Sequence, residues 1–280
     1  MDYYRPQQFR ILPPVVKNLL IINAIFFIAT ISMEKMNIDL IDKLGLHYFS
    51  SEKFHPYQLI TYMFMHGSFM HIFYNMFAVW MFGSAIENVW GTRRFLTFYI
   101  VTGLGAAFTH YVVVYFEMHP TLMAINDFLN NPTNDSLKSF MASSNFHISS
   151  ENIAGTTNEF IAKYNLLLSE GNKTAALQSA VNFMSEYKTE FLNAPVVVGA
   201  SGALFGLLLA FGMMFPNSLI FIYFLLPIKA KYFVIIYGAI ELFSGFSKIS
   251  GDNVAHFAHL GGMLFGYLLI IFWKKRNMYD

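Results

Sequence analysis

The sequence of 280 residues contains no cysteine, which excludes disulfides, thiolate catalysis and cysteine-bound zinc or iron–sulfur sites. Charged residues are also scarce, at 12% of the chain, whereas hydrophobic residues make up 55%. The formal net charge is only +1, so the basic excess typical of nucleic-acid binding is missing and no nucleic-acid partner is expected. This composition is typical of a polytopic membrane protein.

Long apolar segments are present instead, and six of them are candidates for membrane-spanning helices. A helix needs about 20 apolar residues to cross a hydrocarbon core of about 30 Å. The six expected spans are 15–33, 67–86, 95–116, 195–215, 231–246 and 253–273. The first follows basic residues, as a secretory signal would, but no small-residue cleavage site follows it, so we expect it to be retained. The apolar segment 217–228 is short for a span and is expected to be an interfacial connection.

Basic residues are distributed unequally between the two sides of this predicted bundle. With the N-terminus inside, ten lie on the inner side and four in the short outer loops, which fits the positive-inside rule. The inner residues are Arg5, Arg10, Lys17, Arg93, Arg94, Lys229, Lys231, Lys274, Lys275 and Arg276, and the outer ones are Lys35, Lys43, Lys53 and Lys248. We therefore expect a multi-pass protein of the plasma (inner) membrane with both termini in the cytoplasm.

Residues 117–193 interrupt the pattern of spans. They contain eight of the 17 acidic residues and no long apolar run. Within 159–191 apolar residues recur at helical spacing, which predicts two amphipathic helices. The predicted organisation is a water-facing, helical insertion on the outer face, 117–193, between two parts of one membrane domain, 1–116 and 194–280.

Polar side chains occur at three places where the predicted spans should be apolar. Such residues are costly in a membrane and by default suggest function. They are His66, His71 and Asn75 in HGSFMHIFYN, Ser201 in GASG, and His256 and His259 in NVAHFAHLGG. Under the expected orientation, the second, fourth and sixth spans all begin outside, so the three clusters reach a similar depth below the outer surface.

Two glycine pairs provide a way for the fourth and sixth spans to approach each other closely. Gly202–Gly206 and Gly262–Gly266 both have the GxxxG spacing, which allows close backbone contact in lipid. Such packing would bring the Ser201 hydroxyl to an imidazole, the arrangement of a serine nucleophile activated by a histidine base. A single GxxxG pair or a single helix serine is more often structural, so only their joint occurrence with the histidines indicates a catalytic site.

Acyl transfer also requires hydrogen-bond donors for the developing oxyanion. Asn75 and His71, four residues apart on one helix face, are the candidate side-chain donors, and the Ser201 backbone N–H is a third. Phe205 could pack on the histidine ring and fix its orientation. No aspartate is expected at this depth, so a dyad rather than a triad is predicted. His66 is interpreted as a structural residue that bonds the first loop to the second span.

These residues resemble the rhomboid family of intramembrane serine proteases over about 200 residues. The motifs are HGSFMHIFYN, GSAIENVWG (83–91), GASG (199–202) and AHLGGMLFG (258–266). The resemblance implies a six-transmembrane-helix bundle in which a Ser–His dyad cleaves transmembrane protein substrates near the membrane surface. It implies that Ser201 is the nucleophile and that His71 and Asn75 form the oxyanion hole, with Gly199 in a supporting position.

The resemblance also distinguishes the two histidines of the sixth span. The family's catalytic histidine is followed by glycine at the third and seventh positions, which matches His259 but not His256. His256 is expected one turn closer to the outer surface, as a hydrogen-bonded neighbour that could assist.

The chain departs from the family pattern in two places. Tyr57 and Gln58 stand where many members have Trp-Arg, so we expect amide bonds to hold the first loop. Phe205 stands where the family often has a tyrosine. Glu87, Arg93 and Arg94 resemble the family's polar junction after the second span and are interpreted as structural. The insertion lies on the expected active-site face, and the hypothesis is that it recognises or gates substrates.

Two other functions are consistent with parts of the sequence. A catalytically silent relative could act as a scaffold that binds membrane proteins, but the joint presence of serine, histidines and asparagine argues against it. A histidine-lined transporter or metal site would want carboxylates in the membrane, and only Glu241, near a span end, is a candidate. A metalloprotease would need an H-E-x-x-H helix, which the sequence lacks. The expected partners are therefore transmembrane substrates and membrane lipid, with no metal and no cofactor.

Overall fold

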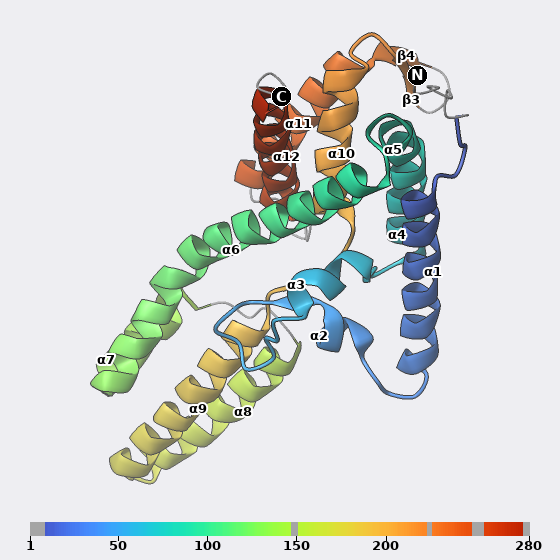
Figure 1. Ribbon diagram of the computed structural model, residues 1–280. Helices are drawn as coiled ribbons and strands as arrows, with labels where there is room; N and C mark the ends of the chain where they lie inside the picture. Colours follow the sequence, from blue (N-terminus) through green and yellow to red (C-terminus); the bar gives the residue numbers. More distant parts are fainter. Residues whose placement is uncertain (1–8, 147–150, 223–225, 248–254, 277–280) are drawn as a thin grey trace, which may run out of the picture. The chain divides into compact units, whose positions relative to one another are not determined.

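The computed structural model describes residues 9–146, 151–222, 226–247 and 255–276, and these are helical nearly throughout (Figure 1). The chain divides into two compact units. The first comprises Met1–Leu46, Pro56–His110 and Val197–Asp280, and the second comprises His47–His55 and Tyr111–Val196. Arg5 and Lys248, which were counted in the charge asymmetry, lie outside the described residues.

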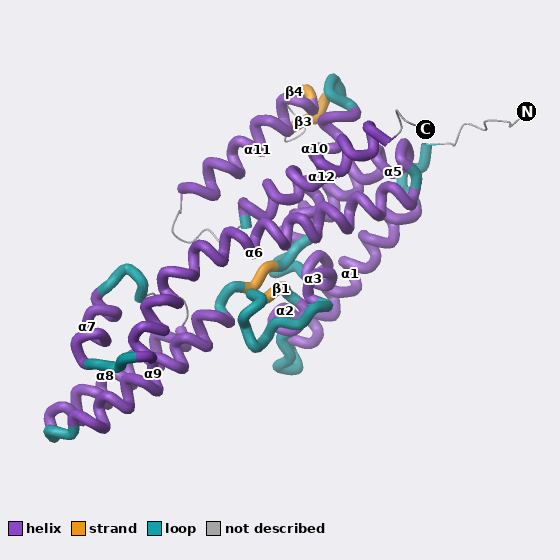
Figure 2. The backbone as a smooth tube through the Cα atoms, turned by 60° about the vertical axis from the view of Figure 1, so that its left-hand side comes forward, coloured by secondary structure: helices purple, strands orange, loops and turns teal. Residues whose placement is uncertain are grey.

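The first unit is a bundle of helices with one small hairpin. The four-residue strands β3 (Leu219–Ile222) and β4 (Leu226–Lys229) pair antiparallel between α10 and α11, within the segment expected to be an interfacial connection (Figure 2). The helices of this unit are α1 (Pro14–Glu34), α2 (Leu40–Leu44), α3 (Gln58–Thr61), η1 (Tyr62–Phe64), α4 (Phe69–Ala78), the π-helical turn η2 (Val79–Gly83), α5 (Ser84–Trp90), the first part of α6 (Thr92–Asn130), α10 (Ser201–Met214), α11 (Ala230–Ser247) and α12 (His256–Arg276).

Four helices in the described residues are long and apolar enough to cross a membrane, so the chain is an integral membrane protein. They are Pro14–Glu34, Phe69–Trp90, Thr92–Asn130 and His256–Lys275. The expected fourth span is shorter than predicted, because the helix begins only at Ser201 and has 14 residues. The segment before it is not helical: strand β2 (Val196–Val197) and an extended approach replace the first turn.

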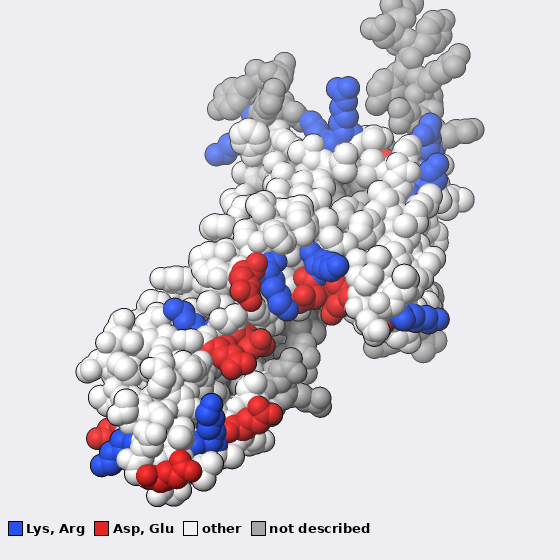
Figure 3. Space-filling view, turned by 90° about the horizontal axis from the view of Figure 1, so that it is seen from below, with Lys and Arg blue, Asp and Glu red and all other residues white. Residues whose placement is uncertain are grey.

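Exposure in this unit is typical of helices that face lipid. Large apolar side chains such as Ile28 on α1 and Phe243 on α11 are 64% and 74% exposed. Charged side chains are sparse over much of the face drawn in Figure 3. Water would not favour so much exposed apolar surface, whereas hydrocarbon does.

Glu87 joins the end of the second span to the beginning of α1. Its two carboxylate oxygens accept hydrogen bonds from the backbone N–H groups of Val15 and Val16, at 3.0 and 2.9 Å. The first N–H groups of a helix have no partner within the helix and carry partial positive charge, so a buried carboxylate is well placed there. These two hydrogen bonds support the structural role expected of Glu87.

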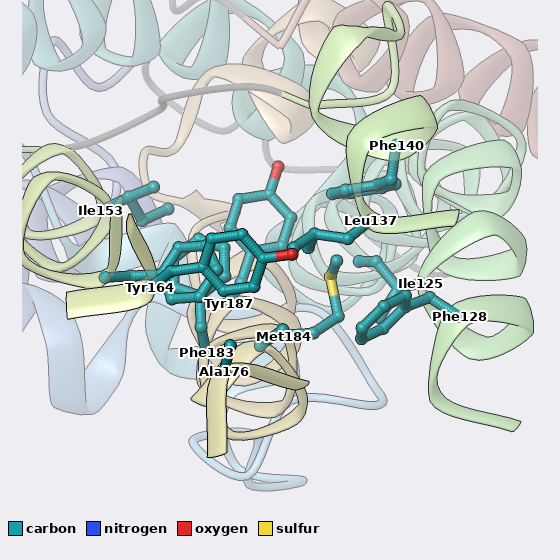
Figure 4. Close-up of a cluster of buried hydrophobic side chains, with 12 residues drawn as sticks. Ile125, Phe128, Leu137, Phe140, Ile153, Tyr164, Ala176, Phe183, Met184 and Tyr187 are labelled. Carbon is teal, nitrogen blue, oxygen red and sulfur yellow. The ribbon is translucent and has the colours of Figure 1, made fainter. Parts of the chain in front are cut away.

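The second unit contains the remaining part of α6, followed by α7 (Asn134–Ala142), α8 (Glu151–Ser169) and α9 (Lys173–Asn193), together with β1 (Leu46–His47) at its border. The amphipathic segments expected within 159–191 fall in α8 and α9. Apolar side chains from these helices, α6 and α7 meet in one buried cluster (Figure 4). Within it Phe160 and Phe183 stack with ring centroids 4.2 Å apart.

Candidate active site

Ser201 is the first residue of α10, and the two residues before it set its position. Gly199 has a φ of +122°, a conformation that side chains with a Cβ rarely adopt. Its N–H donates to the carbonyl of Tyr62 at 2.9 Å. A Cβ at Gly199 would lie 2.8 Å from His71 Nε2. Glycine is therefore required here both by the backbone conformation and by the imidazole packed against it.

The Ser201 hydroxyl lies against one of the two histidines of α12. The distance from Ser201 Oγ to His259 Nε2 is 2.8 Å, within hydrogen-bond range. His259 is buried and Ser201 is partly buried. The structure thus brings Ser201 to His259 and not to His256.

Glycines make this approach possible, though not in the symmetrical way that the sequence suggested. A Cβ on Gly262 would overlap the carbonyl oxygen of Gly202, so α12 contacts the backbone of α10 directly. Gly266 continues this contact, since its Cβ would lie 3.4 Å from the Cα of Gly206. The missing side chains of Gly202 and Gly206 instead make room for α6, where Ala106 and Thr102 would collide with them.

Two aromatic rings fix the plane of His259. Phe205 stacks on the imidazole with centroids 4.2 Å apart and an angle of 6° between the rings. On its other side Phe205 stacks on Tyr237 of α11, at 5.2 Å and 8°. Because Phe205 lies one turn after Ser201, α10 supplies both the hydroxyl and the platform for the histidine, and tyrosine is not needed for the stacking.

Asn75 and His71 of α4 point toward the same segment. Asn75 Nδ2 is buried and has no hydrogen-bond partner among the described residues, and it lies 3.6 Å from the position of a Cβ on Gly199. An unpaired buried N–H typically costs about 1–3 kcal/mol, so its retention beside the serine is typical of a donor held for a ligand.

His66 lies in the loop before α4 and packs edge-on against His71, with ring centroids 4.9 Å apart. Burial lowers the pKa of His66 to about 4, so its ring is neutral near pH 7. Neither ring nitrogen of His66 has a hydrogen-bond partner among the described residues, so the expected hydrogen bond from the first loop to the second span is not found.

The first loop is held by amide and hydroxyl groups, as the replacement of Trp-Arg suggested. Gln58 Nε2 and the Tyr57 hydroxyl both donate to the carbonyl of Lys43, at 3.2 and 3.3 Å. Thr61 Oγ1 donates to the neighbouring carbonyl of Leu44 at 2.7 Å.

Glu241 of α11 is the residue that sequence reasoning missed. Its Oε2 lies 2.9 Å from His259 Nδ1 and 2.7 Å from His256 Nδ1. The sequence predicts no aspartate at this depth and places Glu241 only near a span end, whereas the structure brings the Glu241 carboxylate to the histidine. Glu241 lies six residues before the end of α11 at Ser247, and His256 is the first residue of α12.

Glu241, His256 and His259 are also the one group in the described residues whose donor atoms could hold a metal ion, since these atoms lie within 4.8 Å of one another. Their mutual hydrogen bonds account for this arrangement without a metal. The geometry as it stands is that of a serine, a histidine and a carboxylate in line, with amide and imidazole donors nearby.

Comparison with known proteins identifies the domain. The family model described as "Rhomboid domain" matches residues 53–122 and 146–276, which is more than half of the chain. The resemblance drawn from the motifs is thereby confirmed. A search of curated proteins returned no match.

Proposed function

This chain belongs to the rhomboid family, and we propose that it is an intramembrane serine endopeptidase. It would hydrolyse peptide bonds in or next to the transmembrane segments of membrane-protein substrates. The observation that carries this proposal is the 2.8 Å distance between Ser201 Oγ and His259 Nε2.

In the proposed reaction, His259 Nε2 takes the proton of the Ser201 hydroxyl while Oγ attacks the carbonyl carbon of the scissile bond. The carbonyl oxygen becomes an oxyanion, which Asn75, His71 and the Ser201 backbone N–H would stabilise. When the C–N bond breaks, His259 returns the proton to the leaving amine. A water molecule, deprotonated by the same nitrogen, then attacks the ester carbonyl and releases the serine.

The unpaired Nδ2 of Asn75 supports its assignment to the oxyanion hole. A buried donor near Gly199 that has no partner within the described part of the chain needs no rearrangement when negative charge develops. Gly199 supports the same assignment, because its missing side chain brings the backbone before Ser201 to His71.

We further propose that α10 and α11 cross the membrane with the four longer helices, giving six spans and two cytoplasmic termini. The supporting observation is that Ser201 and His256 are the first residues of α10 and α12, and that His71 is near the start of α4. Helices that all begin at the site put it near one membrane surface. The charge asymmetry makes that the outer surface of a plasma (inner) membrane.

The proposed substrates are helices in lipid, and the proposed role of the 117–193 insertion is to recognise or gate them. A photo-crosslinker at Leu166, which is 58% exposed on α8, tests this role. In a Ser201→Ala background it should crosslink a bound substrate. Absence of crosslinks, although the substrate still co-purifies with this variant, would remove the insertion from the recognition step.

The decisive experiment is labelling of the detergent-solubilised protein by a fluorophosphonate, with cleavage of a helix-unstable transmembrane reporter measured in parallel. Ser201→Ala should abolish both signals. His259→Ala should abolish turnover, whereas the matched variant His256→Ala should keep much of it. An unlabelled wild-type protein that binds the reporter without cutting it would instead favour a catalytically silent scaffold.

A further inference from the structure

A serine hydrolase with only two catalytic residues has no carboxylate beside its histidine, whereas in this protein the carboxylate of Glu241 lies against His259. Glu241 is 6% exposed, and burying an ionised carboxylate is costly unless it is paired. Among the described residues, it bonds the Nδ1 atoms of His259 and His256, both through the same oxygen. We propose that Glu241 is a positioning residue for His259, so that the catalytic unit is the triad Ser201–His259–Glu241.

With Glu241 ionised, its hydrogen bonds determine which nitrogen of His259 carries the proton. An ionised carboxylate only accepts, so Oε2 bonds both rings only if each ring carries its proton on Nδ1. With the proton on Nδ1, His259 Nε2 presents its lone pair to the Ser201 hydroxyl, 2.8 Å away. This is the tautomer that a general base requires.

The same carboxylate acts again when the proton moves. After His259 takes the serine proton it is a cation in a buried site, and an anion 2.9 Å from Nδ1 stabilises it. Glu241 does not need to accept the proton or touch the substrate. Its effect on the reaction passes through His259.

His256 has a distinct part in this arrangement. Its Nδ1 lies 2.7 Å from Glu241 Oε2, the oxygen that also bonds His259. The variant His256→Ala removes this second bond and keeps the carboxylate. It therefore measures the contribution of the second bond separately from that of the carboxylate itself.

The inference rests on the proposed function, and the test is a double-mutant cycle in full-length protein, with kcat, KM and the fluorophosphonate rate measured for each variant. Glu241→Gln should lower kcat by about 10²–10⁴, because loss of the acidic member of a serine triad costs up to about 10⁴, with little change in KM. Glu241→Asp, still ionised, should regain at least about tenfold over the glutamine variant. His256→Ala should lower kcat less than Glu241→Gln does, because it keeps the carboxylate that bonds His259.

The decisive comparison is made in the His259→Ala background. If Glu241 acts through His259, Glu241→Gln should add no further loss to the residual rate. If Glu241 has only a structural role, Glu241→Gln should lower the rate in the His259→Ala background by the same factor as in the wild-type background, and this result would overturn the inference. A wild-type kcat in Glu241→Gln would overturn it as well. If the glutamine variant does not fold, the aspartate variant replaces it in the same cycle. A wild-type protein without labelling or cleavage would overturn the proposed function, and the inference with it.

Discussion

Replacing Gly262 by alanine tests whether backbone contact between α10 and α12 sets the geometry of the site. The added Cβ would overlap the carbonyl oxygen of Gly202, a backbone atom that cannot rotate away. Carbon and oxygen need roughly 3.5 Å between them, so the helices must separate by about 1 Å or more. Starting from 2.8 Å, the bond between Ser201 and His259 would then exceed hydrogen-bond length.

The expected magnitude follows from that displacement. A misplacement of about 1 Å typically costs about 10²-fold in rate, and overpacking costs about 1–3 kcal/mol of stability. The assay is the rate of fluorophosphonate labelling and reporter cleavage, normalised to the folded fraction from thermal unfolding in detergent. We expect Gly262→Ala to lower both rates by about 10²-fold.

The matched control is Gly266→Ala, the same substitution in the same glycine pair. Its Cβ would lie 3.0 Å from the ring atom Cζ of Phe98, which can shift, and 3.4 Å from the Cα of Gly206. A small adjustment of the ring suffices, so most of the activity should remain. Equal activity in Gly262→Ala and wild type would refute the claim that this contact sets the distance from serine to histidine.

Three further predictions concern residues around the site and in the second unit. Asn75→Ala should lower kcat by about 10²–10³ with little change in KM, since one oxyanion donor is lost; a change in KM alone would exclude that role. Phe205→Ala should slow labelling by about tenfold through loss of the stacking on His259, whereas Phe205→Tyr should keep the rate; equal rates in both would show that stacking does not orient the ring. Phe183→Ala should destabilise the second unit by about 3–5 kcal/mol, seen as earlier proteolysis within 111–196 while labelling persists; unchanged proteolysis would contradict the place of Phe183 in that core.

Much of the membrane domain could be read from local patterns. The length of the apolar segments was enough to locate α1, the candidate span Phe69–Trp90, α6 and α12. A helix in hydrocarbon makes all its backbone hydrogen bonds internally and has a continuous apolar run in the sequence. The start of the fourth span could not be located this way. The residues before Ser201 are as apolar as those after it, whereas in the structure Gly199 has a φ of +122° and its N–H bonds the carbonyl of Tyr62, a contact that the local pattern does not indicate.

The residues of the candidate site also differ in whether local sequence patterns could identify them. Ser201, His259, Asn75 and His71 could be identified because polar groups stand out against an apolar background. Glu241 stands out equally, but the sequence does not show which residue it contacts. Helical spacing does not specify how α11 and α12 are rotated toward each other.

The sequence by itself determined that this protein lies in a membrane and that it belongs among the rhomboids, and its motif pattern favoured His259 over His256. Those conclusions need only composition, spacing and motif order. Tertiary structure decided that His259 lies within hydrogen-bond distance of the serine and that a carboxylate lies behind it. The reason is physical: hydrogen bonds depend on tenths of an ångström and on the rotation of each helix about its axis, which here is set by glycine contacts between helices far apart in the chain.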